Sequence, residues 1–264
     1  MGKIIGIMSL KGGVGKTSVV ASLVAALAGL GKKVLLIDAN FSAPNLGIHF
    51  NLIEPEKTLH DVMTRRANLK DVIYAVGDLD IIPAAMFNDD QIAPLRLKEK
   101  IKPLKKKYDV ILIDSSPSVA EEGLATLFAA DEIFFVITPD HATLSNTIKT
   151  VNRANQRGTA INGLILNKVH SKDFELTLEQ IEDTTNVPVM AVLPYELNVL
   201  EAQSNFIPSV KHRPKSRGSR EFKKLAATLM GEKHDLGFWK KIFRARPKKE
   251  EINRELFYDR IFNE

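Results

Sequence analysis

The sequence predicts an α/β fold: a doubly wound, mainly parallel β-sheet flanked by helices, with a C-terminal helical extension. Two observations lead to this prediction. Short runs of branched apolar residues alternate with longer segments of helical spacing, as in strands joined by crossover helices. Toward the C-terminal end the composition becomes basic and aromatic. We therefore expect one large domain over residues 1–231 and an amphipathic, basic extension over residues 232–264.

The apolar runs have the length and the Ile/Val content of buried strands. They cover residues 4–8, 34–37, 110–113, 133–137, 164–166 and 189–193. The segments with helical spacing cover residues 17–30, 95–107, 121–129, 142–156 and 176–184, and residues 223–230 predict a last core helix closed by Gly231. Ligands bind beyond the carboxyl ends of the strands in such a sheet, so we expect the functional residues there.

Composition excludes several classes of site. The chain has 264 residues and no cysteine, which rules out disulfides, thiolate zinc sites and cysteine-ligated iron–sulfur clusters. No apolar run approaches the ~20 residues that span a bilayer, and the N-terminus leads into a strand rather than a signal peptide. We expect a cytoplasmic protein. Its net charge of +5 suggests an anionic partner.

Residues 11–17 read Lys-Gly-Gly-Val-Gly-Lys-Thr, between the first strand and the first helix. Glycines let successive backbone N–H groups face one anion, and the helix N-terminus adds partial positive charge. Lys16 should reach the β- and γ-phosphates, and the Thr17 hydroxyl should bind Mg²⁺. We therefore expect ATP and Mg²⁺ as cofactors. The residues expected at the nucleotide are Gly12, Gly13, Val14, Gly15, Lys16, Thr17 and Ser18.

A second lysine at the start of this loop, Lys11, makes it resemble the deviant Walker A ATPases, which include MinD, ParA and the nitrogenase iron protein. In that family this lysine crosses a dimer interface to the phosphates of the partner's nucleotide. The resemblance implies that Lys11 acts in trans, so that ATP binding and homodimer formation are one equilibrium. The alternative is an ordinary surface lysine.

The second strand leads into a segment that resembles switch I of MinD and ParA. Asp38 matches the first acid of its D-x-D pattern, which supports magnesium through water, and Asn45 and Leu46 match the following N-L pair. The second acid, which positions and polarises the attacking water in the family, is Asn40 here. An asparagine can orient a water but cannot accept its proton, so we expect slow hydrolysis.

Three further matches complete the resemblance. Asp114, at the end of the strand 110–113 and followed by Ser-Ser-Pro, resembles the switch II aspartate that holds the water shell of magnesium. In MinD-like proteins an asparagine at the position of Asn167 bonds the adenine, and the chain around a proline at the position of Pro194 packs against it. The resemblance covers roughly residues 3–231. The missing cysteines argue against the nitrogenase iron protein, which leaves the positioning branch, MinD or ParA. Within this branch the chain most resembles archaeal-type MinD-like proteins.

The segment 236–244 separates into two faces at about 100° per residue. Phe238, Trp239, Ile242 and Phe243 fall on one face, and Lys240, Lys241 and Arg244 on the other. Basic, aromatic helices of this kind lie in membrane interfaces, and MinD proteins end in a similar helix. We expect peripheral attachment to the cytoplasmic face of an anionic membrane. The alternative is a helix that folds back onto the domain.

Two other segments leave alternatives open. Residues 248–264 predict a helix that is apolar around most of its circumference, and it should pack on its own domain or on another protein. The basic residues between 211 and 224 could contact DNA, as in ParA, or form a solvated surface, which we favour.

Three functions therefore compete. The first is a MinD-like ATPase whose ATP dimer recruits an unknown protein partner to the membrane, and the second is a ParA-like ATPase that moves DNA or other cargo. The third is an ATP-locked scaffold that does not hydrolyse.

Overall fold

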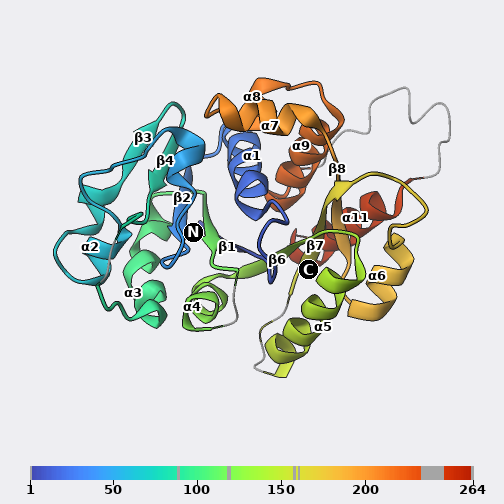
Figure 1. The fold of residues 1–264 in the computed structure, drawn as a ribbon, viewed down its shortest axis with the longest axis horizontal. Helices are drawn as coiled ribbons and strands as arrows, with labels where there is room; N and C mark the ends of the chain where they lie inside the picture. The colour runs from blue at the N-terminus through green and yellow to red at the C-terminus, as the bar shows by residue number, and fades with distance from the viewer. Residues whose placement is uncertain are drawn as a thin grey trace.

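The structure, a computed structural model, describes residues 2–87, 90–117, 120–156, 159, 161–232 and 247–262. One eight-stranded sheet runs through the described chain in the order β3-β4-β2-β5-β1-β6-β7-β8 (Figure 1). Neighbouring strands pair in parallel, except β3 and β4, which are antiparallel. The predicted fold class is confirmed.

The apolar runs predicted as strands all form strands. The strands are β1 Lys3–Met8, β2 Val34–Ala39, β3 Tyr74–Val76, β4 Leu79–Ile82, β5 Val110–Ser115, β6 Glu132–Ile137, β7 Gly163–Val169 and β8 Val189–Pro194. The sequence did not predict β3 and β4. The strand β3 has only 3 residues and none of them is buried, and Asp80 interrupts the apolar run of β4. Its carboxylate accepts a hydrogen bond of 2.7 Å from the Tyr108 hydroxyl.

Each predicted helical segment of the described chain contains a helix, two of them with different bounds, and the short helices α2, α7 and α8 were not predicted. They are α1 Lys16–Ala28, α2 Leu59–Met63, α3 Leu97–Ile101, α4 Glu121–Ala129, α5 His141–Gln156, α6 Leu178–Thr185, α7 Leu197–Ser204, α8 Ser209–His212, α9 Arg217–Leu229 and α11 Lys249–Phe262. The helix predicted over 95–107 is broken into α3 and two 3₁₀ turns, because Pro103 has no N–H to donate. The last core helix starts earlier than predicted, where the Ser216 hydroxyl accepts from the Ser219 N–H at 3.1 Å.

Helices cover both faces of the sheet. A core that includes side chains of α1, α8, α9 and α11 lies on one face. Two further clusters, with side chains of α2, α3 and α4 and of α4, α5 and α6, lie on the other. In Figure 1 the first group, apart from α11, lies above the strands, and α3, α4 and α5 lie below them. The carboxyl ends of the strands stay open between these layers.

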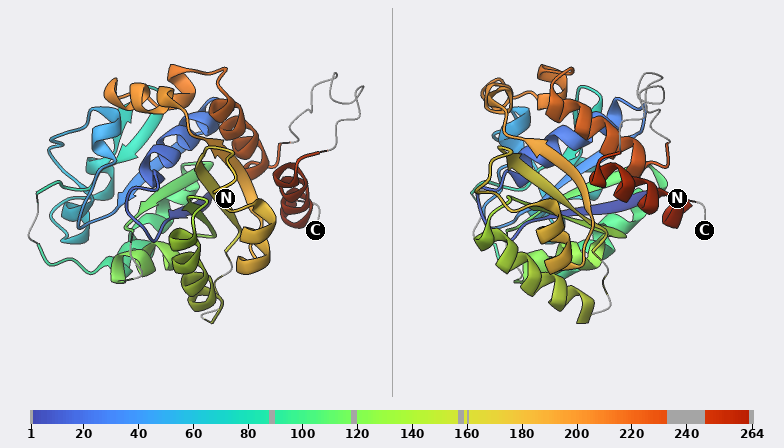
Figure 2. Two further views of the ribbon diagram at one scale, coloured as in Figure 1. Left: turned by 45° about the vertical axis from the view of Figure 1, so that its right-hand side comes forward. Right: turned by 90° about the vertical axis from the view of Figure 1, so that its right-hand side faces the viewer.

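The last helix predicted from the sequence corresponds to α11, and the structure shows where it packs. It lies against α9 and β8, beside α6 (Figure 2), so its partner is its own domain. Fewer apolar side chains of α11 are buried against the domain than the sequence predicts. Phe257 is 3% exposed, whereas Ile252 and Leu256 are 41% and 63% exposed. The boundary between residues 231 and 232 remains a prediction.

Candidate nucleotide site

The glycine-rich loop joins β1 to α1 in a conformation that two glycines make possible. Gly13 and Gly15 have φ angles of 80° and 87°, in the left-handed region. A Cβ on Gly15 would lie 2.5 Å from the Asn167 side-chain nitrogen, so this position has no room for a larger residue. The loop therefore brings its backbone to the start of α1, as the motif predicts.

Lys16 and Thr17, in the first turn of α1, both contact Asp114 at the end of β5. The Lys16 ammonium is paired with one carboxylate oxygen of Asp114, and the Thr17 hydroxyl donates to the other at 2.8 Å. The Lys16 and Asp114 side chains are 6% and 1% exposed. The predicted phosphate lysine, magnesium threonine and switch II aspartate thus form one cluster, in which Lys16 and Asp114 are buried and Thr17 is partly buried.

Asp38 lies beside this cluster. It pairs in register with Asp114 between β2 and β5, and its carboxylate accepts from the N–H groups of Asn40 and Leu46 at 3.0 and 3.1 Å. Burial and the neighbouring charge of Asp114 raise the pKa of Asp38 to about 7. A divalent cation would relieve this repulsion. Carboxylate and hydroxyl oxygens are the ligands that Mg²⁺ prefers, so Thr17, Asp38 and Asp114 fit such an ion.

Asn40 is buried, with a free acceptor. Its amide nitrogen donates to the carbonyl oxygen of Ala43. Among the described residues its Oδ1 atom has no hydrogen-bond partner, although the atom is buried. A buried unpartnered acceptor is costly, and a water molecule in the adjoining cavity would satisfy it. The position therefore suits a group that orients water.

Lys11 lies at the rim of the site. Its ammonium is 3.6 Å from the Asp140 carboxylate, and the two side chains are 47% and 41% exposed. Burial raises the pKa of Asp140, but hydrogen bonds from Thr138 and Thr143 and the charge of Lys11 lower it to about 2. Asp140 is therefore ionised at neutral pH. An exposed pair of this kind contributes little stability and can be exchanged for another anion.

Most of these residues line a cavity of about 460 Å³. It is lined by the loop residues 11–18, Asn40, Asn45, Pro117, Asn167 and Pro194. Asp38 and Asp114 are not part of its lining, but each is bonded to residues that are: Asp114 to Lys16 and Thr17, and Asp38 to the N–H of Asn40. Asn167 donates to the Val14 carbonyl at 2.8 Å, so here it supports the loop at the edge of the cavity.

One wall of the cavity was missed by the sequence analysis. It comes from α7, from the turn before it and from the 3₁₀ turn Gly47–Phe50. The additional lining residues are Ser9, Ile48, His49, Lys168, Tyr195, Glu196, Val199, Leu200 and Gln203. Only Lys168 carried a signal, because it adjoins Asn167. Its ammonium donates to the Gly13 carbonyl at 2.7 Å and so supports the loop from the same side.

The predicted membrane-binding side chains lie outside the described residues. They are Phe238, Trp239, Lys240, Lys241, Ile242, Phe243 and Arg244. In the described part of the chain, no helix combines the length and apolar character that crossing a bilayer requires.

Comparisons with known proteins agree with this site. A family model described as an AAA domain matches residues 2–165. The chain is 32% identical over 240 residues to the uncharacterized ATP-binding protein MJ0547 of Methanocaldococcus jannaschii, covering 90% of this chain and 91% of that protein. It is 33% identical to the septum site-determining protein MinD of Pyrococcus horikoshii, solved with Mg-ADP, with a TM-score of 0.81 and coverage of 94% and 100%. The chain belongs to the MinD/ParA family of P-loop ATPases.

As a MinD/ParA-family protein, the chain is an ATP-binding ATPase. The solved MinC:MinD cell division complex of Aquifex aeolicus shows that such a protein can act with a partner. Its similarity to this chain is 25% identity with a TM-score of 0.79, covering 89% of this chain and 98% of that one.

Proposed function

We propose that this MinD/ParA-family ATPase is a MinD-like switch. ATP and Mg²⁺ bring two copies together, and the dimer positions a partner protein at an anionic membrane on its cytoplasmic side. The observation that carries the proposal is the cavity at which the glycine-rich loop and switch I meet, with Asp114 bonded to the lining residues Lys16 and Thr17. Similarity to a septum site-determining MinD protein supports the same proposal.

In the proposed nucleotide complex, each residue near the loop has a separate task. The loop N–H groups and Lys16 bind the phosphates, while Thr17, Asp38 and Asp114 hold magnesium directly or through water. Bound magnesium supplies charge neutralisation at the phosphates. Lys16 exchanges its bond to Asp114 for the phosphates, which leaves that carboxylate free to face the cation. Asn167 and the chain around Pro194 bind the base.

Hydrolysis in this proposal is slow because of one side chain. The free Oδ1 atom of Asn40 can accept a hydrogen bond from the attacking water and so position it. The amide cannot take the proton of that water. Phosphoryl transfer depends mainly on positioning and electrostatics, so the reaction is retarded rather than abolished.

The proposed membrane contact rests on the sequence of residues 236–244. Burying four large apolar side chains in lipid would contribute several kcal/mol at about 25 cal/mol per Å². Forming a short helix offsets much of this gain, and each basic side chain near an anionic surface adds about 1 kcal/mol. A single copy should bind weakly, whereas two copies in one ATP dimer bind together and gain from effective concentration.

Vesicle sedimentation tests this contact. We expect the protein to sediment with anionic vesicles when ATP is bound, and much less without ATP, in high salt or with neutral vesicles. Trp239→Glu should abolish binding and leave ATP-dependent dimerisation intact, because a carboxylate cannot enter the acyl boundary. Phe174, 80% exposed on the domain, provides the matched control. The Phe174→Glu variant should bind vesicles like the parent protein. Vesicle binding that does not change with nucleotide, with salt or with Trp239→Glu would contradict the membrane role.

The basic cluster between residues 211 and 224 supports a DNA-binding role less well. Lys211 is paired with Asp78, and Arg213 lies 3.7 Å from Glu201. Lys224 is bound to Glu221 and Glu251 at 3.0 and 2.9 Å. DNA phosphates would have to replace these carboxylates as partners of the basic side chains. We therefore favour an anionic membrane over DNA as the binding surface.

A further inference from the structure

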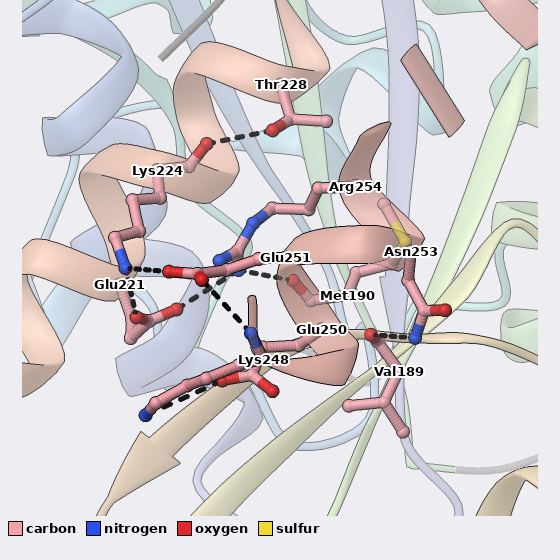
Figure 3. Close-up of polar contacts among 10 residues, drawn as sticks. All are labelled: Val189, Met190, Glu221, Lys224, Thr228, Lys248, Glu250, Glu251, Asn253 and Arg254. Atoms are coloured by element: carbon pink, nitrogen blue, oxygen red, sulfur yellow. Dashed lines mark hydrogen bonds and ion pairs between the residues drawn. The ribbon is translucent and has the colours of Figure 1, made fainter. Parts of the chain in front are cut away.

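Helix α11 is attached to the domain mainly by polar side chains (Figure 3). The Lys224 ammonium of α9 donates to Glu251 at 2.9 Å. The Arg254 guanidinium donates through Nη1 to the Met190 carbonyl at 2.8 Å and to Glu221 at 3.1 Å. The Glu251 and Arg254 side chains are only 9% and 6% exposed. These buried charges connect α11 to both α9 and β8.

The first half of α11 also covers the free edge of the sheet. Strand β8 is the last in the sheet order, so its outer backbone groups have no strand beside them. The Val189 carbonyl accepts from the Asn253 side chain at 2.8 Å, and the Val189 N–H donates to Glu182 at 2.7 Å. Lys249 is paired with the same Glu182 at 2.9 Å. The cover is therefore built from side-chain hydrogen bonds rather than from a paired strand.

Two aromatic side chains of α11 add contacts with the domain, and one of them, Phe262, is 40% exposed and lies with its ring centroid 5.0 Å from the Lys3 ammonium. Phe257 packs edge-on against Phe134 with ring centroids 5.9 Å apart, and it is the buried apolar side chain that α11 contributes in the described chain. Within that same part of the chain, the Nη2 atom of Arg254 is buried without a hydrogen-bond partner. The attraction within buried ion pairs is largely offset by their desolvation. By contrast, α9 buries three large apolar side chains, Phe222, Leu225 and Leu229.

We propose that α11 is a detachable, salt-sensitive anchor. It leaves the domain as a unit while the sheet and α9 stay folded, and its release uncovers the edge of β8.

The link to surface binding follows from the charges at the start of α11, and it rests on the proposed function. Lys249 is paired with Glu182, and Lys248 lies 3.8 Å from Glu250. An anionic membrane would compete with these carboxylates for the two lysines. Membrane binding therefore favours release of α11, and release in turn favours membrane binding.

Native-state hydrogen exchange of the full chain, read by mass spectrometry, tests whether α11 opens by itself. The informative amides are those of residues 252–258, in the middle of the helix, because the ends of any helix fray. We expect them to exchange at least about 100-fold faster than the amides of β5, through an opening that low denaturant barely changes. Raising the salt from about 0.05 to 1 M should speed their exchange about fivefold.

Arg254→Ala should speed exchange of the same amides by about 100-fold more, because it leaves Glu221 buried without this partner. Glu255, exposed on the same helix, gives the control, and Glu255→Ala should stay within about twofold of the parent. Equal protection and equal denaturant dependence in α11 and β5 would overturn the proposal. If neither salt nor Arg254→Ala changes the exchange of the amides of residues 252–258, the helix only frays, and the proposal is likewise wrong. Vesicle binding with Trp239→Glu tests the proposed function separately.

Discussion

Lys11→Ala is expected to abolish ATP-dependent dimerisation and to leave a folded protein that still binds nucleotide. Lys16 and the loop amides remain to hold the phosphates within one copy. The contact across the interface would be lost, and truncating a charged group buried in an interface costs about 2–5 kcal/mol. The dimer dissociation constant should therefore rise about 30-fold or more, measured by light scattering at a fixed ATP concentration.

The ion pair of Lys11 with Asp140 gives this prediction a control. Asp140→Asn removes the charge that holds Lys11 within its own copy, while an asparagine can still accept the 2.9 Å bond from the Thr143 N–H. This variant should dimerise at the same ATP concentration as the parent, or at a lower one. If Lys11→Ala dimerises like the parent, Lys11 is an ordinary surface lysine.

Asn40→Asp is expected to raise ATP turnover by about 10–100-fold, the contribution of general-base help. The new carboxylate would occupy the position of the free Asn40 Oδ1 atom, at the wall of the cavity, and could accept the proton of the attacking water. Steady-state phosphate release under saturating ATP and Mg²⁺ measures the effect. ATP affinity should change less than turnover, because the water rather than the phosphate is the affected group.

Asn45 offers a matched change within the same segment. It also lines the cavity, but its side chain is exposed and donates to the Ala43 carbonyl at 3.1 Å. Asn45→Asp adds a carboxylate at an exposed side chain rather than at the buried position of Asn40, so turnover should not rise. Equal turnover in the parent and in Asn40→Asp would show that another group organises the water, and our account of switch I would fail.

Local signals in the sequence were enough to predict the central sheet and the loop. Five of the predicted strands lie in the middle of the sheet, where burial on both faces requires uninterrupted Ile and Val runs. The order of those strands was not predictable from such runs. The pairing of β2 with β5 puts Asp38 next to Asp114, and the charge of Asp114 adds to burial in raising the pKa of Asp38.

The missed parts of the site have a common cause. Helix α7 has 8 residues, and Leu197 and Leu200 on it are 66% and 53% exposed, so no buried apolar face marked it in the sequence. Lys168 has a φ angle of 59° and donates to the Gly13 carbonyl of the loop, and no local pattern indicates either feature. Motif spacing identified the residues that bind phosphate, whereas the walls around them depend on tertiary packing.

The central claim is that ATP controls assembly, and size-exclusion chromatography with light scattering tests it most directly. The protein should be run without nucleotide, with Mg-ADP and with Mg-ATP, and the nucleotide in each peak should then be identified. Our account predicts a mass near 29.4 kDa without nucleotide and with ADP. With ATP it predicts a dimer of about twice that mass that retains ATP, since hydrolysis is slow. The same mass in all three conditions would contradict it.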